Sequence, residues 1–317
     1  MKGLCFDRFG GPEVLFYGDL PEPELQNGGA IVEMEAIELN YADIYRRQGR
    51  YHLQGSPPFI AGYEGAGWVV ASAGTFSVGQ RVAFVDSPFA NAERVFVRDE
   101  HLIPLPETVS AELAASVLLQ GLTAAYLVQD SYLVQRGDWA IVLAAAGGVG
   151  QQLAQQIRNR GGRVFGLTSD PRKFEVIRAA GADAVATYAE DWVARARELS
   201  PGGVQVVYDS MGSTLRKSLD AVRNGGHVVF YGKADGEPDL VDPRLLMDRS
   251  LTLTGGDLWN VLHSSDERRR RARALFDDFA AGHLRVDPPT RFSLSDGAAA
   301  HRWLESRVST GKGILVP

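Results

Sequence analysis

Cysteine is nearly absent from this 317-residue chain, in which Cys5 is the only example. One thiol excludes an internal disulfide and any multi-cysteine zinc site, and it suits a reducing compartment, so we expect the protein in the cytoplasm. Cys5 itself lies near the start of a predicted strand and is expected to be a small buried residue. The histidines show no metal-ligand spacing either.

Long apolar runs and a surplus of basic charge are lacking as well. No apolar run approaches the ~20 residues of a membrane span, so we expect no membrane partner. A formal net charge of −6 argues against nucleic acid as the main partner. The basic run at 267–273 is flanked by acidic residues, which favours a solvated helix face over a nucleic-acid patch.

What the chain does have is a glycine-rich turn between an apolar stretch and a helical pattern. The stretch 141–143 predicts a strand, and 151–160 predicts a helix. The turn matches the dinucleotide fingerprint G-x-G-x-x-G with Ala145 in the first glycine slot. Small residues let the backbone approach a pyrophosphate, and the helix start offers N–H groups and partial positive charge. We predict cofactor binding here, the alternative being mere helix packing, by Ala146, Gly147, Gly148, Val149 and Gly150.

Two patterns of secondary structure divide the chain. Short strands at 30–39, 62–70, 81–85 and 92–97, separated by turn residues, are typical of a small, partly open β barrel. Helices are predicted at 110–118 and 123–134, with Ser110 capping the first. From Trp139 strands and helices alternate, which predicts an α/β fold with a doubly wound parallel sheet that ends in a strand at 250–254.

The C-terminal segment is too short to form a core of its own. A long helix at 265–281 is followed by short segments at 292–295, 301–306 and 314–316. We therefore expect this segment to return to the N-terminal domain. The predicted domains are 1–121 together with 257–317, and 122–256 for the nucleotide domain.

Short motifs along nearly the whole chain match one known family. Besides the fingerprint, they lie at 9–15, 39–49, 62–67, 121–124, 208–212 and 310–312. The sequence resembles the zinc-free quinone oxidoreductases, the zeta-crystallin-like branch of the medium-chain dehydrogenase/reductases. The resemblance implies a GroES-like barrel domain interrupted by a Rossmann NADP-binding domain. It also implies an active site in the cleft between them and a homodimer joined through nucleotide-domain strands.

The zinc ligands of zinc-dependent relatives have no counterpart here. Those relatives carry Cys where this chain has Asn40, and His-Glu where it has Tyr63 and Glu64, and they have a four-cysteine lobe near position 90. A catalytic zinc needs three protein ligands, and only Glu64 remains. We predict no metal and no alcohol dehydrogenation.

The end of the second nucleotide-domain strand discriminates between the nicotinamide cofactors. An NAD site usually has an acid there, and Thr168 holds that slot. Ser169 follows, and the family's phosphate-binding Lys and Tyr match Lys173 and Tyr188, so we predict NADPH. A solvated helix face is the alternative for Lys173. Asp170 is predicted to be an N-cap, the alternative being a ribose ligand that would favour NADH.

The reacting end is assigned by the resemblance. The family's Asn, Tyr and Tyr match Asn40, Tyr45 and Tyr51, and a tyrosine hydroxyl can donate to the quinone oxygen as negative charge develops. The alternative is that the tyrosines only pack and bind the cofactor. Thr123 is assigned to the carboxamide or to a helix cap, and Gly212 to the adenosine side or to a simple turn. The rest of the predicted cofactor set is Asn40, Tyr231, Gly232 and Lys312.

Three functions follow from these residues. The first is NADPH-dependent reduction of a small-molecule quinone, by hydride or single electrons, without zinc. The second is NADPH-dependent reduction of an alkenal or enone double bond by the same cofactor arrangement. The third is an NADPH-binding structural or RNA-binding protein of the crystallin type.

Overall fold

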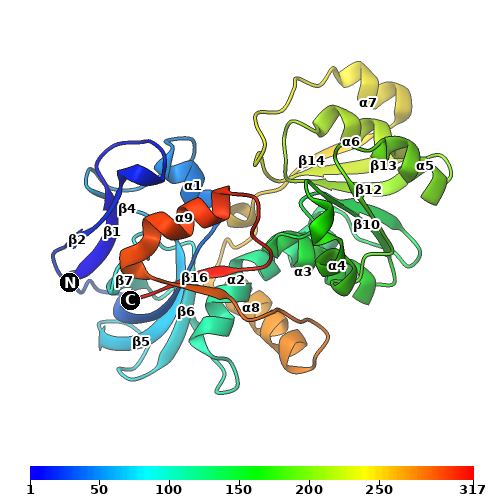
Figure 1. The fold of residues 1–317 in the computed structure, drawn as a ribbon. Helices are drawn as coiled ribbons and strands as arrows, with labels where there is room; N and C mark the ends of the chain where they lie inside the picture. The colour runs from blue at the N-terminus through cyan, green and yellow to red at the C-terminus, as the bar shows by residue number, and fades with distance from the viewer. The chain divides into compact units, whose positions relative to one another are not determined.

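The computed structural model describes all 317 residues and separates them into two compact units (Figure 1). Unit 1 contains Met1–Leu119 and Leu262–Pro317, and unit 2 contains Gln120–Val261. The domain boundaries predicted from the sequence were 121/122 and 256/257, against changes of unit at 119/120 and 261/262. The mixed α/β fold class is confirmed by the sheets of the two units.

Unit 1 is built on two sheets. The larger follows the order β15-β16-β3-β5-β6-β8 with β7 also paired to β3, and the smaller follows the order β2-β1-β4. All pairs are antiparallel except β15 with β16. The strands are β1 (Lys2–Phe6), β2 (Leu15–Asp19), β3 (Gly29–Glu38), β4 (Phe59–Ile60), β5 (Glu64–Ser72), β6 (Arg81–Val85), β7 (Arg94–Arg98), β8 (Leu102–Pro104), β15 (Thr290–Ser293) and β16 (Gly313–Val316). The four strands predicted in this part of the sequence are confirmed as β3, β5, β6 and β7.

The C-terminal segment completes the N-terminal sheet. Ile314 and Leu315 of β16 pair with Glu38 and Ile37 of β3, and Leu315 is buried in the core of unit 1. Figure 1 shows α9 (Gly297–Glu305) and β16, both in red, beside the blue N-terminal elements. The predicted return of this segment is confirmed. Cys5 is buried in β1, as expected, and burial raises the pKa of its thiol to about 11.

Helix α2 corrects the sequence prediction. It runs unbroken over Ala111–Tyr126 and is followed by a π-helical turn at Leu127–Ser131. The predicted helical character of 110–118 and 123–134 is confirmed for residues 111–118 and 123–131. The predicted break between them is wrong, because Gly121 does not interrupt a helix that is buried on both sides of it. Thr123 lies inside α2 and cannot be an N-cap.

The same helix corrects the expectation about apolar runs. Residues 111–131 contain an 18-residue window with a mean hydropathy of 1.5, long and apolar enough to cross a membrane. However, 72% of the apolar window is buried inside the protein. That burial is typical of a core helix.

The arginine-rich helix α8 (Ser265–Ala280) is only partly solvated. Ser264 caps it by accepting from the N–H of Glu267. Arg268 is 3% exposed and donates to the carbonyls of Glu100 and Leu262. The neighbouring Arg269 donates to the carbonyls of Asp99 and Leu102. The prediction of a solvated face is therefore wrong for Arg268, whose charge anchors the helix to the loop before β8.

Unit 2 is the predicted doubly wound domain. Its six strands are all parallel in the order β11-β10-β9-β12-β13-β14. They are β9 (Trp139–Val142), β10 (Arg163–Thr168), β11 (Ala184–Thr187), β12 (Val204–Asp209), β13 (Val222–Phe230) and β14 (Thr252–Gly255), in green to yellow in Figure 1. Both faces of the central strands are covered, which explains their nearly continuous apolar sequences. The last strand, β14, forms the predicted sheet edge.

Five helices connect these strands. They are α3 (Gly148–Asn159), α4 (Phe174–Ala179), α5 (Trp192–Leu199), α6 (Leu215–Ala221) and α7 (Pro243–Arg249). Because right-handed crossovers are the rule, the reversal of strand order after β11 puts α3 and α4 on one face and α5 and α6 on the other. Helix α7 was not predicted, and neither was α1 (Tyr41–Arg47) in unit 1.

Candidate functional site

The predicted dinucleotide turn lies between β9 and α3 of unit 2. Gly147 is the N-cap residue, and α3 starts at Gly148. A Cβ at Gly150 would lie 2.7 Å from the Cα of Ala145, so a side chain there would push α3 away from the strand. A Cβ at Gly147 would meet a single atom within 4 Å, the carbonyl oxygen of Ala144 at 3.2 Å. Gly150 therefore packs the helix, whereas the space beside Gly147 is open to a ligand.

The start of α3 suits an anion. The first N–H groups of an α-helix have no partners within the helix, and the helix dipole adds partial positive charge. No acidic residue lies in the first turn of α3. The N–H of Gly147 already donates to the carbonyl of Ala144 at 2.9 Å. The other main-chain N–H groups between Ala146 and Gly150 lie at a helix start that carries no opposing carboxylate. This arrangement fits the phosphates of a dinucleotide.

Tyr188, which follows β11, is tied to the same turn. Its hydroxyl accepts a 2.7 Å hydrogen bond from the N–H of Ala144, which has a positive φ of 49°. Burial raises the pKa of Tyr188 above its ordinary value. Because the hydroxyl oxygen accepts this bond, its hydrogen can be donated to a phosphate oxygen. The contact brings the predicted phosphate ligand Tyr188 to the fingerprint.

The segment after β10 contains the residues predicted to select the cofactor. Asp170 accepts from the N–H of Arg172 at 2.9 Å, which confirms its predicted N-cap role. The Arg172 guanidinium also binds both carboxylate oxygens of Asp170, the shorter contact being 2.6 Å. Lys173 is only 9% exposed, and burial lowers its pKa. The alternative of a solvated lysine is therefore wrong, and Ser169 beside it is exposed.

The turn after β12 is built around a buried carboxylate. Asp209 is fully buried and accepts from the N–H groups of Met211 and Gly212 at 2.8 and 3.2 Å. It also accepts from the Ser218 hydroxyl at 2.6 Å. Gly212 has a φ of 82°, and a Cβ there would overlap the carbonyl of Gly236. The turn role of Gly212 is thus present in the structure, and its adenosine contact stays a prediction.

The predicted cofactor residues of unit 2 share one edge of the sheet. Tyr231 follows β13 and donates its N–H to the carbonyl of Asp209 at 2.9 Å. A Cβ at Gly232 would lie 2.9 Å from the carbonyl oxygen of Ser210. The segments after β9, β10, β11, β12 and β13 all leave the carboxyl ends of parallel strands, where doubly wound sheets bind ligands. Thr123 is a buried residue of α2 in the same unit.

In unit 1, Asn40 begins α1 and contacts a buried acid. The N–H of Asn40 donates to Asp43 at 3.1 Å in a capping box, and its side-chain amide donates to Glu64 at 3.1 Å. The other Glu64 oxygen accepts from the N–H of Leu119 at 2.7 Å. Glu64 is 1% exposed, and burial raises its pKa well above the ordinary value. These bonds fix Asn40 in one orientation.

The two predicted tyrosines lie on and just after α1. Tyr45 is half-buried in the helix and contacts Tyr41 edge to face, with ring centroids 5.8 Å apart. Tyr51 lies in an irregular segment, and its ring contacts that of His52 in a tilted arrangement with centroids 3.9 Å apart. Lys312 is buried and forms an ion pair with Glu38. Its assignment to the cofactor stays a prediction, like those of the two tyrosines.

Comparisons with known proteins agree with this geometry. The alcohol dehydrogenase GroES-like domain matches residues 26–135, and the zinc-binding dehydrogenase family matches residues 180–315. A quinone oxidoreductase of Pseudomonas aeruginosa is 36% identical over 324 residues, which are 100% of this chain and 99% of that protein. The chain belongs to the quinone oxidoreductases of the medium-chain dehydrogenase/reductase family.

Two further proteins are similar to this quinone oxidoreductase family member over almost their full length. The crystal structure of Escherichia coli quinone oxidoreductase complexed with NADPH has a TM-score of 0.95 at 31% identity and covers 100% of both chains. A 2-haloacrylate reductase of Burkholderia is 33% identical over 323 residues, which are 97% of this chain and 96% of that protein. The resemblance read from the motifs is confirmed.

The donor set of this quinone oxidoreductase family member does not fit a catalytic zinc. Such an ion needs three protein ligands in tetrahedral reach. No three His, Cys, Asp or Glu side chains are grouped so that they could hold a metal ion. The groups that contact Glu64 are two hydrogen-bond donors, the side-chain amide of Asn40 and the main-chain N–H of Leu119.

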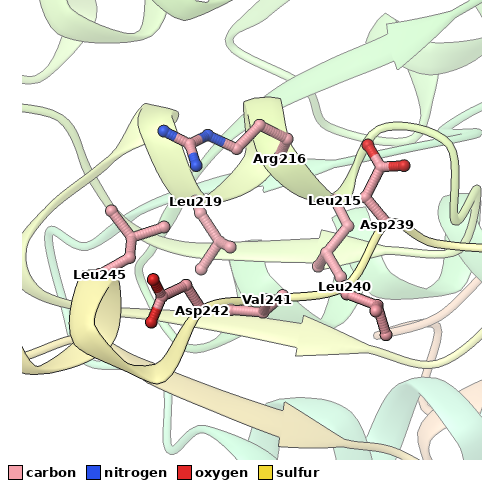
Figure 2. A pocket seen from close by; sticks show the side chains of 8 residues that line it. All are labelled: Leu215, Arg216, Leu219, Asp239, Leu240, Val241, Asp242 and Leu245. Carbon is pink, nitrogen blue, oxygen red and sulfur yellow. The ribbon is translucent and has the colours of Figure 1, made fainter.

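A hollow of about 330 Å³ on unit 2 lies outside the predicted site (Figure 2). None of its lining residues belongs to the predicted cofactor set, and its side chains come from α6 and from 239–245. Asp242 on its rim is bound by Arg244 at 2.6 Å and caps α7.

Two residues of the candidate site were missed in the sequence. Asp209 has the signal of an acid at the end of a buried strand, where its carboxylate can cap the following turn. Arg46 pairs with Asp43 on the same helix, but its contacts with His52 and Tyr63 involve residues beyond the helix and gave no local signal.

Proposed function

We propose that this protein is an NADPH-dependent quinone reductase that works without zinc. The observation that supports it best is the open turn at Gly147, which meets the unopposed N-terminus of α3 at the carboxyl edge of the sheet. Similar full-length proteins are named quinone oxidoreductases, and one was crystallised with NADPH. When bound, NADPH supplies a hydride from its nicotinamide ring.

The chain's own residues would hold the cofactor in three groups. Main-chain N–H groups from Ala146 to Gly150, including Gly148 and Val149, would bind the pyrophosphate. Ser169, Lys173 and Tyr188 would bind the 2′-phosphate, and the pairing of Asp170 with Arg172 weakens the repulsion between Asp170 and that phosphate. Contacts with the rest of the cofactor are assigned to Asn40, Thr123, Gly212, Tyr231, Gly232 and Lys312.

At the reacting end, the chain orients the quinone and supplies a hydrogen-bond donor. The phenol hydroxyls of Tyr45 and Tyr51 can donate to the quinone oxygen as it gains negative charge. Asn40 is held by hydrogen bonds to Asp43 and Glu64 and would form a rigid part of this site. The final protons can come from water, so the tyrosines need not titrate.

The absence of a fitting donor set supports the zinc-free part of the proposal. We further propose a cytoplasmic homodimer. The single buried Cys5 suits a reducing compartment. The edge strand β14 presents one row of backbone groups without a sheet partner in this chain, and a second copy can pair with it.

A second candidate activity is reduction of an activated carbon–carbon double bond. The similar 2-haloacrylate reductase favours it. Steady-state rates with 1,4-benzoquinone and 9,10-phenanthrenequinone, compared with 2-alkenals, decide between the two. Turnover of alkenals alone would reject the quinone reductase. The crystallin-type or RNA-binding alternative has no support from the arginine-rich helix, because Arg268 and Arg269 bind main-chain carbonyls of this protein.

A further inference from the structure

Helix α1 contains two adjacent arginines that are both buried. Arg46 is 1% exposed and Arg47 is 0% exposed. A buried charge is strongly destabilising unless it is paired, so each must serve a specific set of partners. Arg47 binds Glu305 at 2.7 Å, His301 at 3.0 Å and the carbonyl of Gly10, which ties α1 to α9 and the N-terminal region. Arg46 contacts a different set of residues, which includes His52 and Tyr63.

The partners of Arg46 surround Tyr51. Its charge is balanced by Asp43, 3.1 Å away and 2% exposed. Its Nε donates to the main-chain carbonyl of His52 at 3.2 Å. The guanidinium carbon lies 3.6 Å from the ring centroid of Tyr63 and 5.1 Å from that of Tyr51. Cation–π contacts of this kind hold aromatic rings in place, more strongly where water is excluded.

The segment that contains Tyr51 has no helix or strand to hold it. Residues 51–54 are irregular, and they are fastened by two buried side chains from other elements. Arg46 binds the carbonyl of His52, and the hydroxyl of Tyr63 accepts from the N–H of Gln54 at 3.2 Å. The rings of Tyr51 and His52 are in contact, with centroids 3.9 Å apart and planes tilted by 41°, so fixing His52 also limits the movement of Tyr51.

We propose that Arg46 is the positioning residue of Tyr51 in quinone reduction. The proposal rests on the proposed function, because that function assigns Tyr51 to the reacting end. The planar guanidinium stacks on Tyr63 while its N–H groups bind Asp43 and the carbonyl of His52. An ammonium group cannot do both, so Arg46→Lys keeps the charge and loses the geometry.

The test is a double-mutant cycle with an adjacent control. Arg46→Lys should lower kcat for 1,4-benzoquinone about tenfold in the wild-type background, because the Tyr51 hydroxyl is no longer held in position. In the Tyr51→Phe background it should lower kcat less than about twofold, because that hydroxyl is already absent. Arg47→Lys removes an equally buried guanidinium from the same helix without touching 51–54. Its effect on kcat should be the same in both backgrounds. Equal effects of Arg46→Lys in both backgrounds would overturn the proposal.

Hydrogen–deuterium exchange of peptides covering 51–54 gives a readout that needs no activity. Arg46→Lys should speed exchange there about tenfold or more, and Arg47→Lys should leave it unchanged. Unchanged exchange in Arg46→Lys overturns the proposal. If Arg46→Lys does not fold, Arg46→Gln takes its place, since it also removes the guanidinium that binds the carbonyl of His52, and unchanged exchange in that variant overturns the proposal too.

The two readouts separate the failures. A wild-type protein that reduces no quinone rejects the proposed function, while exchange still tests whether Arg46 orders 51–54. A Tyr51→Phe variant with unchanged kcat shows that Tyr51 does not act at the reacting end. In that case quinone reduction stands, and the role of Arg46 in it is overturned.

Discussion

Replacing Lys173 by alanine should remove most of the preference for NADPH over NADH. Lys173 follows β10, is only 9% exposed and lies in the segment capped by Asp170. A hydrogen bond to a charged group contributes about 1.5–3 kcal/mol, and about 1.4 kcal/mol is tenfold in affinity. Lys173→Ala should therefore bind NADPH about 10- to 100-fold more weakly, and NADH about as well as the wild type does.

Isothermal titration calorimetry with both cofactors measures this difference. Lys217→Ala is the matched control, because Lys217 is an exposed lysine of α6 in the same unit and its loss changes the net charge equally. Its NADPH affinity should stay within about twofold of the wild type, since screening weakens distant surface charges. Equal affinities of the wild type for NADPH and NADH would refute the 2′-phosphate assignment. An equal loss for both cofactors in Lys173→Ala would show that the lysine supports the fold instead.

Three further predictions concern the turn, a buried histidine and zinc. In thermal-shift assays, Gly147→Ala should unfold at the same temperature as the wild type but lose the stabilisation that NADPH gives. Gly150→Ala should unfold at a lower temperature, because overpacking destabilises the fold by about 1–3 kcal/mol. Burial and Arg47 lower the pKa of His301 to about 3, against 6.5 ordinarily, so the unfolded chain takes up the proton first as the pH falls. Stability should then be lost between pH 6.5 and 3 by up to about 1.4 kcal/mol per pH unit, and His301→Gln should flatten this slope in urea titrations; an unchanged slope would contradict the assignment. Metal analysis should find far less than one zinc per chain, and EDTA should leave quinone reduction unchanged; stoichiometric zinc would contradict the zinc-free site.

Most of the strands were predictable, because their burial pattern can be read from neighbouring residues, whereas β2, β4 and β8 were not predicted. Buried parallel strands such as β12 are nearly continuous apolar runs, and β3 alternates where one face is covered. Helices α1 and α7, with seven residues each, were missed, although α6 of the same length and the six-residue α4 were predicted, so length alone does not explain the difference. Their starts did carry signals: an Asn40–Asp43 capping box in α1, and Asp242 followed by Pro243 in α7.

The candidate site divides in the same way. The fingerprint and the N-cap at Asp170 depend on neighbours in sequence, so residue type and spacing predicted them. The burial of Arg268 and the contacts of Arg46 depend on segments that only folding brings together. A charged residue in a basic or helical run looks solvated until its tertiary partners are known.

The pairing of β16 with β3 has a consequence for synthesis. The ribosome must translate through Val316, the last residue of β16, before β3 can pair with that strand. The whole nucleotide-binding unit therefore emerges while the edge of β3 that β16 will cover is still unpaired. A nascent chain stalled shortly before β16 should expose that edge to chaperones even though its coenzyme turn is already built.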